Sequence, residues 1–163
     1  MRVFLGSDHA GFELKAHLLS AIADAGHEAV DCGAFEYTAD DDYPPFCFEV
    51  GERTVAEPGT LGVVIGGSGN GEQIAANKVP GVRAALAWND DTATLARQHN
   101  DANVVAIGAR QHSIEQATEL VLTFLATPFS QDPRHVRRIG LVSDYERDRH
   151  RPAGGLPTNP AHP

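Results

Sequence analysis

The sequence has few cysteines, few basic residues and no long apolar run. Its 163 residues include two cysteines and 13 basic against 22 acidic side chains. No apolar run approaches the roughly 18 residues of a membrane-spanning helix, and the chain opens on an apparent strand instead of a signal peptide. Two cysteines form no disulfide framework, and a net charge of −9 argues against non-specific nucleic-acid binding. We therefore expect a soluble, cytoplasmic protein without nucleic-acid or membrane partners.

Short apolar runs alternate with amphipathic segments along the chain. Nearly continuous apolar runs are typical of buried strands, and they predict strands at 2–7, 29–32, 61–66, 82–87 and 103–108. The other segments predict helices at 11–25, 44–57, 71–78, 90–99, 113–127 and 133–149. This alternation predicts right-handed crossovers, and therefore an α/β fold with a doubly wound parallel five-stranded sheet and helices on both faces.

The composition is that of one globular domain, with 42% hydrophobic and 21% charged residues. We expect this domain to span residues 1–149. Residues 150–163 contain four prolines and two glycines, which predict a flexible tail without a chemical role. Within the domain, Ser113 and Gln116 have the spacing of a capping box at the start of helix 113–127.

Polar residues cluster where a ligand site is expected. In doubly wound sheets, ligands bind beyond the carboxyl ends of the strands. The first strand leads into Asp8 and His9, the strand 61–66 leads into a glycine-rich loop, and the last strand leads into Arg110. His99 and Asn100 end the helix before the last strand, and we expect them to join this cluster.

The loop 66–72 reads Gly-Gly-Ser-Gly-Asn-Gly-Glu. Four glycines in six residues, between a strand and a helix, favour backbone amides that converge on an anion, although a tight turn would also need glycine. A P-loop is excluded because Glu72 stands where lysine is required, and a dinucleotide fingerprint lacks its third glycine. Nucleotide binding survives as a minority interpretation, supported by Asp90 about 20 residues further on.

Glu72 beside this loop is suited to abstracting a proton next to a carbonyl. The carboxylate would take the carbon-bound proton, while loop amides and the Ser68 hydroxyl stabilise the oxyanion. The alternative is an ordinary first-turn acid favoured by the helix dipole. The residues alone leave these two interpretations about equal.

Other catalytic patterns are weak or missing. No H-E-x-x-H, paired-cysteine or calcium-loop spacing occurs, so no metal and no cofactor is predicted. The nucleophile motif G-x-S-x-G is absent around Ser68, and Cys32 fits a small buried hydrophobe better than a nucleophile. Arg134 and Arg138 are one helical turn apart, which suits either a phosphate site or a solvated face paired with Asp132 or Asp144.

Taken together, these residues resemble the type B ribose-5-phosphate isomerase family, which includes galactose-6-phosphate isomerase subunits. The resemblance spans about residues 1–149 in order and spacing, and it excludes the tail. The matching strings are Gly6–Phe12 (GSDHAGF), Asp42–Pro44 (DYP), Gly66–Glu72 (GGSGNGE), Ile74–Lys78 (IAANK), Arg97–Asn103 (RQHNDAN) and Arg134-His135.

The resemblance implies a Rossmann-like enzyme that interconverts ribose 5-phosphate and ribulose 5-phosphate without metal or nucleotide, in the pentose phosphate pathway. It implies homodimers or dimers of dimers with shared active sites. A six-carbon sugar phosphate, such as allose or galactose 6-phosphate, is the nearer alternative substrate. A non-catalytic nucleotide-binding module is the more distant alternative function.

The resemblance also assigns roles to single residues. Asp8 and His99 would open the sugar ring, and Asn100 and the loop amides would assist the anion. Many family members carry a catalytic cysteine where this chain has Gly66, so this chain resembles the subgroup whose base is the glutamate at Glu72, with Ser68 moving protons between O1 and O2. At the helix start, we expect that carboxylate to stay ionised. The implied substrate-binding residues are His9, Tyr43, Gly67, Gly69, Asn70, Gly71, Asn100, Arg110, Arg134 and Arg138.

Overall fold

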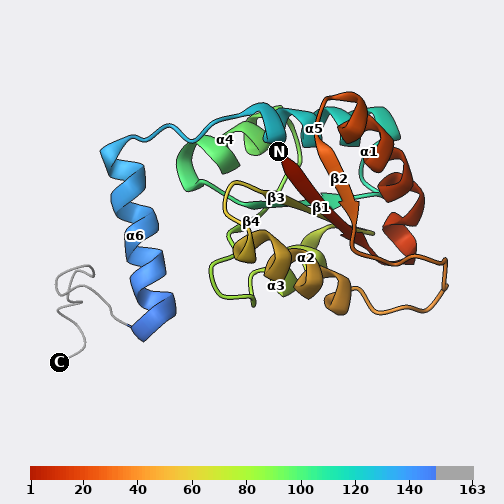
Figure 1. Ribbon diagram of the computed structural model, residues 1–163, viewed down its shortest axis with the longest axis horizontal. Coiled ribbons are helices and arrows are strands. Elements are labelled where there is room, and N and C mark those ends of the chain that lie inside the picture. The colour runs from red at the N-terminus through yellow and green to blue at the C-terminus, as the bar shows by residue number, and fades with distance from the viewer. Residues whose placement is uncertain (150–163) are drawn as a thin grey trace, which may run out of the picture. The chain divides into compact units, whose positions relative to one another are not determined.

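The computed structural model describes residues 1–149, and the predicted tail at 150–163 lies outside them. The sheet has five parallel strands in the order β2-β1-β3-β5-β4 (Figure 1). The strands are β1 (Arg2–Ser7), β2 (Glu28–Asp31), β3 (Leu61–Gly66), β4 (Ala84–Leu86) and β5 (Val104–Gly108). The helices are η1 (His9–Gly11), α1 (Phe12–Asp24), α2 (Pro44–Ala56), α3 (Asn70–Ala76), α4 (Asp90–Asn100), α5 (Ile114–Ala126) and α6 (Pro133–Asp148).

The predicted α/β architecture is confirmed, and β1 and β3 have the predicted bounds. The edge strand β4 is shorter than the predicted run 82–87. The amide of Val82 donates to Val79 in a turn, and that of Arg83 donates to the Asn103 side chain, so neither joins the ladder. The capping box is also confirmed: Ser113 accepts from the Gln116 amide at 3.2 Å, and the Gln116 side chain accepts from the Ser113 amide at 3.1 Å.

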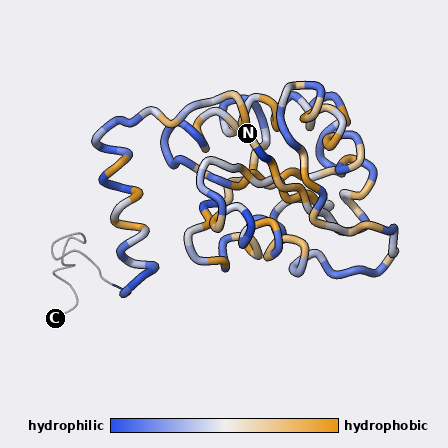
Figure 2. The backbone as a smooth tube through the Cα atoms, viewed as in Figure 1, coloured by the Kyte–Doolittle hydropathy of each residue, from blue (hydrophilic) through white to orange (hydrophobic). Residues whose placement is uncertain are grey.

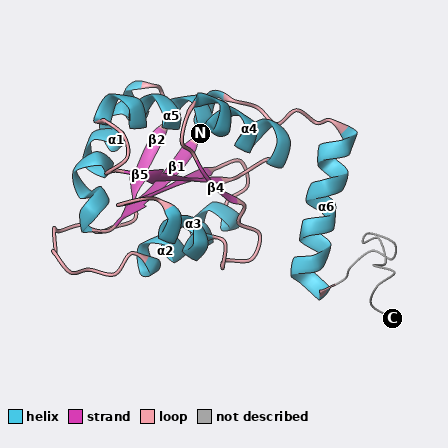
Figure 3. Cartoon of the chain, turned by 180° about the vertical axis from the view of Figure 1, so that it is seen from behind, coloured by secondary structure: helices cyan, strands magenta, loops and turns pink. Residues whose placement is uncertain are grey.

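Helices cover both faces of the sheet (Figures 1 and 3). Side chains alternate along each strand. In β3, Val63 and Ile65 pack with α1, α4 and α5, while Val64 packs with α2 and α3. Figure 2 shows the apolar residues concentrated in the strands between these layers. The three inner strands β1, β3 and β5 are therefore buried on both faces, which accounts for their continuous apolar runs.

The strand order places a topological switch point between β1 and β3. The connection that follows β1 leads outward to β2, whereas β3 lies on the other side of β1. Ligands of open α/β sheets bind at such a point, beyond the carboxyl ends of the strands. Asp8 follows β1 there, and the loop that begins at Gly66 follows β3.

The described residues divide into two compact units, Met1–Ser130 and a second unit that begins at Gln131. The first contains the whole sheet with α1 to α5, and the described part of the second is essentially α6. A single domain over 1–149 stays a prediction. None of the helices in residues 1–149 is both long and apolar enough to cross a membrane.

Candidate functional site

The end of β1 presents Asp8 and His9 at the switch point. Asp8 caps η1, and its Oδ1 accepts from the amides of Ala10 at 3.0 Å and Gly11 at 3.3 Å. Gly11 is required here, because a Cβ would lie 2.7 Å from the carbonyl oxygen of Ile65 in β3. The backbone thus holds a nearly buried carboxylate next to the end of β3.

The glycine-rich loop folds around the carboxylate of Glu72. Gly69 has a φ of +81° and precedes α3, which turns the chain so that Glu72 points back toward the end of β3. A Cβ at position 66 would overlap the Glu72 carboxylate, and a Cβ at position 71 would lie 2.7 Å from the Tyr43 ring. Gly66 thus leaves room for the acid, and Gly71 leaves room for the phenol.

Burial dominates the electrostatics of Glu72. Its side chain is 4% exposed, and this desolvation raises the pKa of its carboxyl above the usual range. The amides of Glu72 and Gly69 oppose the rise, and the negative charge of Asp8 adds to it. From the sequence we expect only that the helix start favours the ionised carboxylate, which would lower its pKa. The net shift of the pKa is in the opposite direction. A raised pKa suits a general base that works near neutral pH.

Ser68 and Asn70 lie on the exposed side of the same loop. The Ser68 hydroxyl accepts from the Asn70 amide at 3.3 Å and from Asn70 Nδ2 at 3.4 Å. The Arg110 amide donates to the Gly67 carbonyl at 3.1 Å, and the Arg110 side chain lies beside Gly67 of the same chain. The structure therefore brings together, at one edge of the sheet, the predicted site residues Asp8, His9, Tyr43, Gly67, Ser68, Gly69, Asn70, Gly71, Glu72 and Arg110.

His99 and Asn100 lie at the opposite edge of the sheet. They end α4, which follows the carboxyl end of β4 and runs back against the strand direction. The Asn100 carbonyl accepts from Arg83 Nε at 2.9 Å, just before β4 begins. The expectation that they join the cluster in the same chain is therefore wrong, since a crossover helix returns to the amino edge.

Arg134 and Arg138 belong to the second unit, on the first turns of α6. Asp132 caps this helix, and its pKa is lowered by the Arg134 amide and by the charges of Arg134, His135 and Arg138. The Arg134–Asp132 contact is loose, at 3.8 Å between Nη2 and Oδ2. The structure gives Arg134 a direct contact with Asp132, and the contact of both guanidinium groups with a substrate phosphate stays a prediction.

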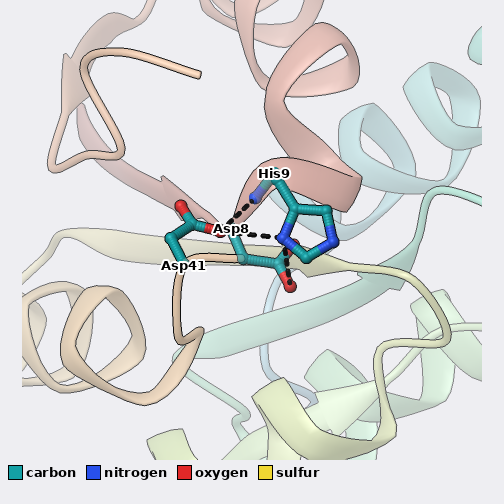
Figure 4. Close-up of side chains that lie close together, drawn as sticks. All are labelled: Asp8, His9 and Asp41. Carbon is teal, nitrogen blue, oxygen red and sulfur yellow. Dashed lines mark hydrogen bonds and ion pairs between the residues drawn. The ribbon is translucent and has the colours of Figure 1, made fainter. Parts of the chain in front are cut away.

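Sequence reasoning missed Asp41. Its Oδ1 accepts from both the backbone amide and Nδ1 of His9, each at 2.8 Å (Figure 4). A metal ion needs several acidic, histidine or cysteine ligand atoms close together. Within residues 1–149, one group of three such residues meets this condition: ligand atoms of Asp8, His9 and Asp41 lie within 4.8 Å of one another. Nδ1 of His9 is already engaged, so the contacts describe an aspartate–histidine pair. Only the long loop between β2 and α2, rich in acidic residues, could have suggested this partner.

The two cysteines allow a test of the proposed base. Cys32 and Cys47 are both buried, and burial raises the pKa of Cys32 to about 11 and that of Cys47 still further. Neither thiol is ionised at neutral pH, and neither is accessible. Iodoacetamide at neutral pH should therefore leave at least about nine-tenths of the activity intact. Inactivation that substrate prevents would implicate a cysteine instead.

Comparisons with known proteins agree with one another. A family described as ribose/galactose isomerase matches residues 3–142. The ribose-5-phosphate isomerase B of Mycolicibacterium paratuberculosis is 57% identical over 152 residues, which cover 93% of this chain and 96% of that relative. A type B ribose 5-phosphate isomerase structure from Trypanosoma cruzi has a TM-score of 0.85 and 43% identity, covering 90% of this chain and 98% of that chain. The ribose-5-phosphate isomerase B of Mycoplasma genitalium, solved with ribulose-5-phosphate bound, has a TM-score of 0.86 and 38% identity, covering 90% and 97%.

Proposed function

Because this chain belongs to the ribose/galactose isomerase family, we propose that it interconverts D-ribose 5-phosphate and D-ribulose 5-phosphate through an enediolate, with Glu72 as the base. The observation that carries this proposal is the Glu72 carboxylate, buried at the switch point in the space that a side chain at Gly66 would fill. Family members with a cysteine at that position would place their thiol close to the same point. The acid here thus occupies the place of the reacting group.

The proton transfers balance within the substrate and these side chains. Glu72 removes the proton from C2 of the open-chain aldose, the C–H electrons form the C1=C2 double bond, and O1 becomes an oxyanion. Glu72 then returns the proton to C1 while O2 becomes the ketone. Ser68, on the exposed side of the loop, carries the hydroxyl proton from O2 to O1. Asp8 and His99 open the ring beforehand, and Asn100 with the loop amides holds the developing charge.

The phosphate needs positive charge at the other end of the substrate. Arg110 provides it at the carboxyl edge, where His9 also lies, and we expect the guanidinium groups of Arg134 and Arg138 on α6 to serve the phosphate as well. We expect Tyr43, which packs on Gly71, to line the sugar site. We expect Gly67, Gly69, Asn70 and Gly71 to contact the sugar through the loop backbone.

The site is completed by a second copy of the chain. Glu72 lies at the carboxyl edge of the sheet and His99 at the amino edge, so one chain cannot direct both at one sugar. A symmetric homodimer, or a dimer of such dimers, brings His99 and Asn100 of one chain to Glu72 of the other. The cytoplasmic location of the protein stays a prediction.

A direct assay tests the substrate. We expect kcat/KM for ribose 5-phosphate to exceed that for galactose 6-phosphate and allose 6-phosphate by about tenfold or more, because the relatives at 53–57% identity are named ribose-5-phosphate isomerase B. A higher kcat/KM for a six-carbon sugar phosphate would identify that sugar phosphate as the substrate instead. No isomerisation of any of them, with micromolar binding of NAD or ATP, would favour the nucleotide-binding alternative.

A further inference from the structure

Asp41 holds the side chain of His9 in one orientation. Asp41 Oδ1 accepts from Nδ1 and from the backbone amide of His9, both at 2.8 Å, whereas the Asp8 carboxylate is 4.0 Å from Nδ1 (Figure 4). We propose that Asp41 is a positioning residue, which fixes the proton on Nδ1 of His9 so that Nε2 is the atom presented to the substrate phosphate. This inference rests on the proposed function for the identity of the ligand.

The surroundings of Asp41 favour this role over a contact with substrate. Its side chain is 12% exposed, and its Oδ2 is buried without a hydrogen-bond partner among residues 1–149. A buried carboxylate with an unpaired oxygen is costly, so its pairing with His9 has to offset that cost. A carboxylate that met the phosphate directly would repel it, whereas in the proposed arrangement the His9 ring would separate the two charges.

Neighbouring contacts restrict the ring further. Tyr37 meets the His9 ring edge-on, with centroids 6.5 Å apart, and Phe12 meets Tyr37 in the same way at 6.0 Å. The His9 side chain stays 26% exposed, and in residues 1–149 its Nε2 has no hydrogen-bond partner. With Nδ1–H donating to Asp41, Nε2 is the ring atom left for the ligand, and it donates to a phosphate oxygen when it also carries a proton.

A graded pair of variants tests the proposal. Asp41→Ala removes the acceptor, and we expect KM for ribose 5-phosphate and Kd for inorganic phosphate to rise together by about tenfold, with kcat within about twofold. Asp41→Asn keeps a neutral acceptor of the same shape and should recover part of this loss. Asp40→Ala is the matched control, because Asp40 lies exposed on the same loop and should change neither constant.

The coupling to His9 distinguishes positioning from a structural effect. If Asp41 acts through His9, His9→Ala combined with Asp41→Ala should bind phosphate no more weakly than His9→Ala alone. Additive losses, an unchanged KM, or a loss confined to kcat would each overturn the proposal. The ¹⁵N NMR spectrum of the wild-type protein, assigned with His9→Ala, should show Nδ1 protonated. An unprotonated Nδ1 would overturn the proposal even where the Asp41 variants fail to fold.

Failure of the proposed function gives a different result. A wild-type protein that does not isomerise ribose 5-phosphate contradicts the assigned reaction. The phosphate affinities and the NMR spectrum would then still decide the role of Asp41, since neither depends on turnover.

Discussion

Replacing Glu72 by glutamine should lower kcat by about 10² to 10⁴, the usual contribution of a general base, while substrate binding stays within a few-fold. Glutamine keeps the shape of the side chain but cannot accept the C2 proton. The midpoint of thermal unfolding should stay the same or rise, because the substitution removes a buried charge close to Asp8. Steady-state kinetics and calorimetric binding of ribose 5-phosphate separate these effects.

The pH dependence of kcat/KM tests the role of Glu72 as the base independently. The base must be ionised, and burial raises the pKa of Glu72 above the ordinary value of 4.5. The kcat/KM of the wild-type protein should therefore decline on acidification at a higher pH than an exposed glutamate would give. Glu52→Gln, an exposed change on α2, is the matched control and should keep both rate and profile. Near-normal turnover by Glu72→Gln would remove Glu72 from the reaction.

Gly66→Ala should be nearly as damaging, although it adds only one methyl group. The new Cβ would overlap the Glu72 carboxylate, which is enclosed by the end of β3 and by α3. The acid must leave its position, so we expect kcat to fall by at least about 100-fold. Overpacking of this kind also destabilises proteins by about 1–3 kcal/mol. Kinetics and urea unfolding measure the two effects.

Gly140→Ala is the control for the glycine substitution. Nothing lies within 4 Å of a Cβ at this position of α6, and alanine favours a helix more than glycine does. Activity should be unchanged and stability equal or slightly higher. If Gly66→Ala kept normal turnover, the carboxylate would not need to occupy the space beside position 66, and the proposed geometry of the base would be wrong.

Local signals in the sequence were sufficient for the sheet and for the glycine-rich loop. The buried strands β1 and β3 have apolar runs that end at glycine or serine, and these runs fix their bounds. The edge strand β4 was predicted too long, because the competing bonds of Val82 and Arg83 depend on Val79 and Asn103. Contacts between distant segments decide such boundaries, and these contacts cannot be predicted from the apolar pattern of one segment.

Two features of the site required the fold. The Asp41–His9 pair joins residues 32 positions apart, through a loop with no regular pattern. The position of His99 follows from the direction of α4, which returns the chain to the amino edge of the sheet. The resemblance alone assigns a chemical role to His99, and that role stays a prediction. The expectation that His99 lies near Glu72 in the same chain ignored the direction of α4.

Mixing two inactive variants tests most directly whether the site is shared. Glu72→Gln and His99→Asn should each be inactive alone. After they are unfolded, mixed in equal amounts and refolded together, half of the dimers should carry one chain of each kind, with one intact site in every such dimer. We expect recovery of about a quarter of the wild-type activity, as symmetric two-chain sites require. No recovery from a mixture that forms dimers would show that Glu72 and His99 do not act across the interface.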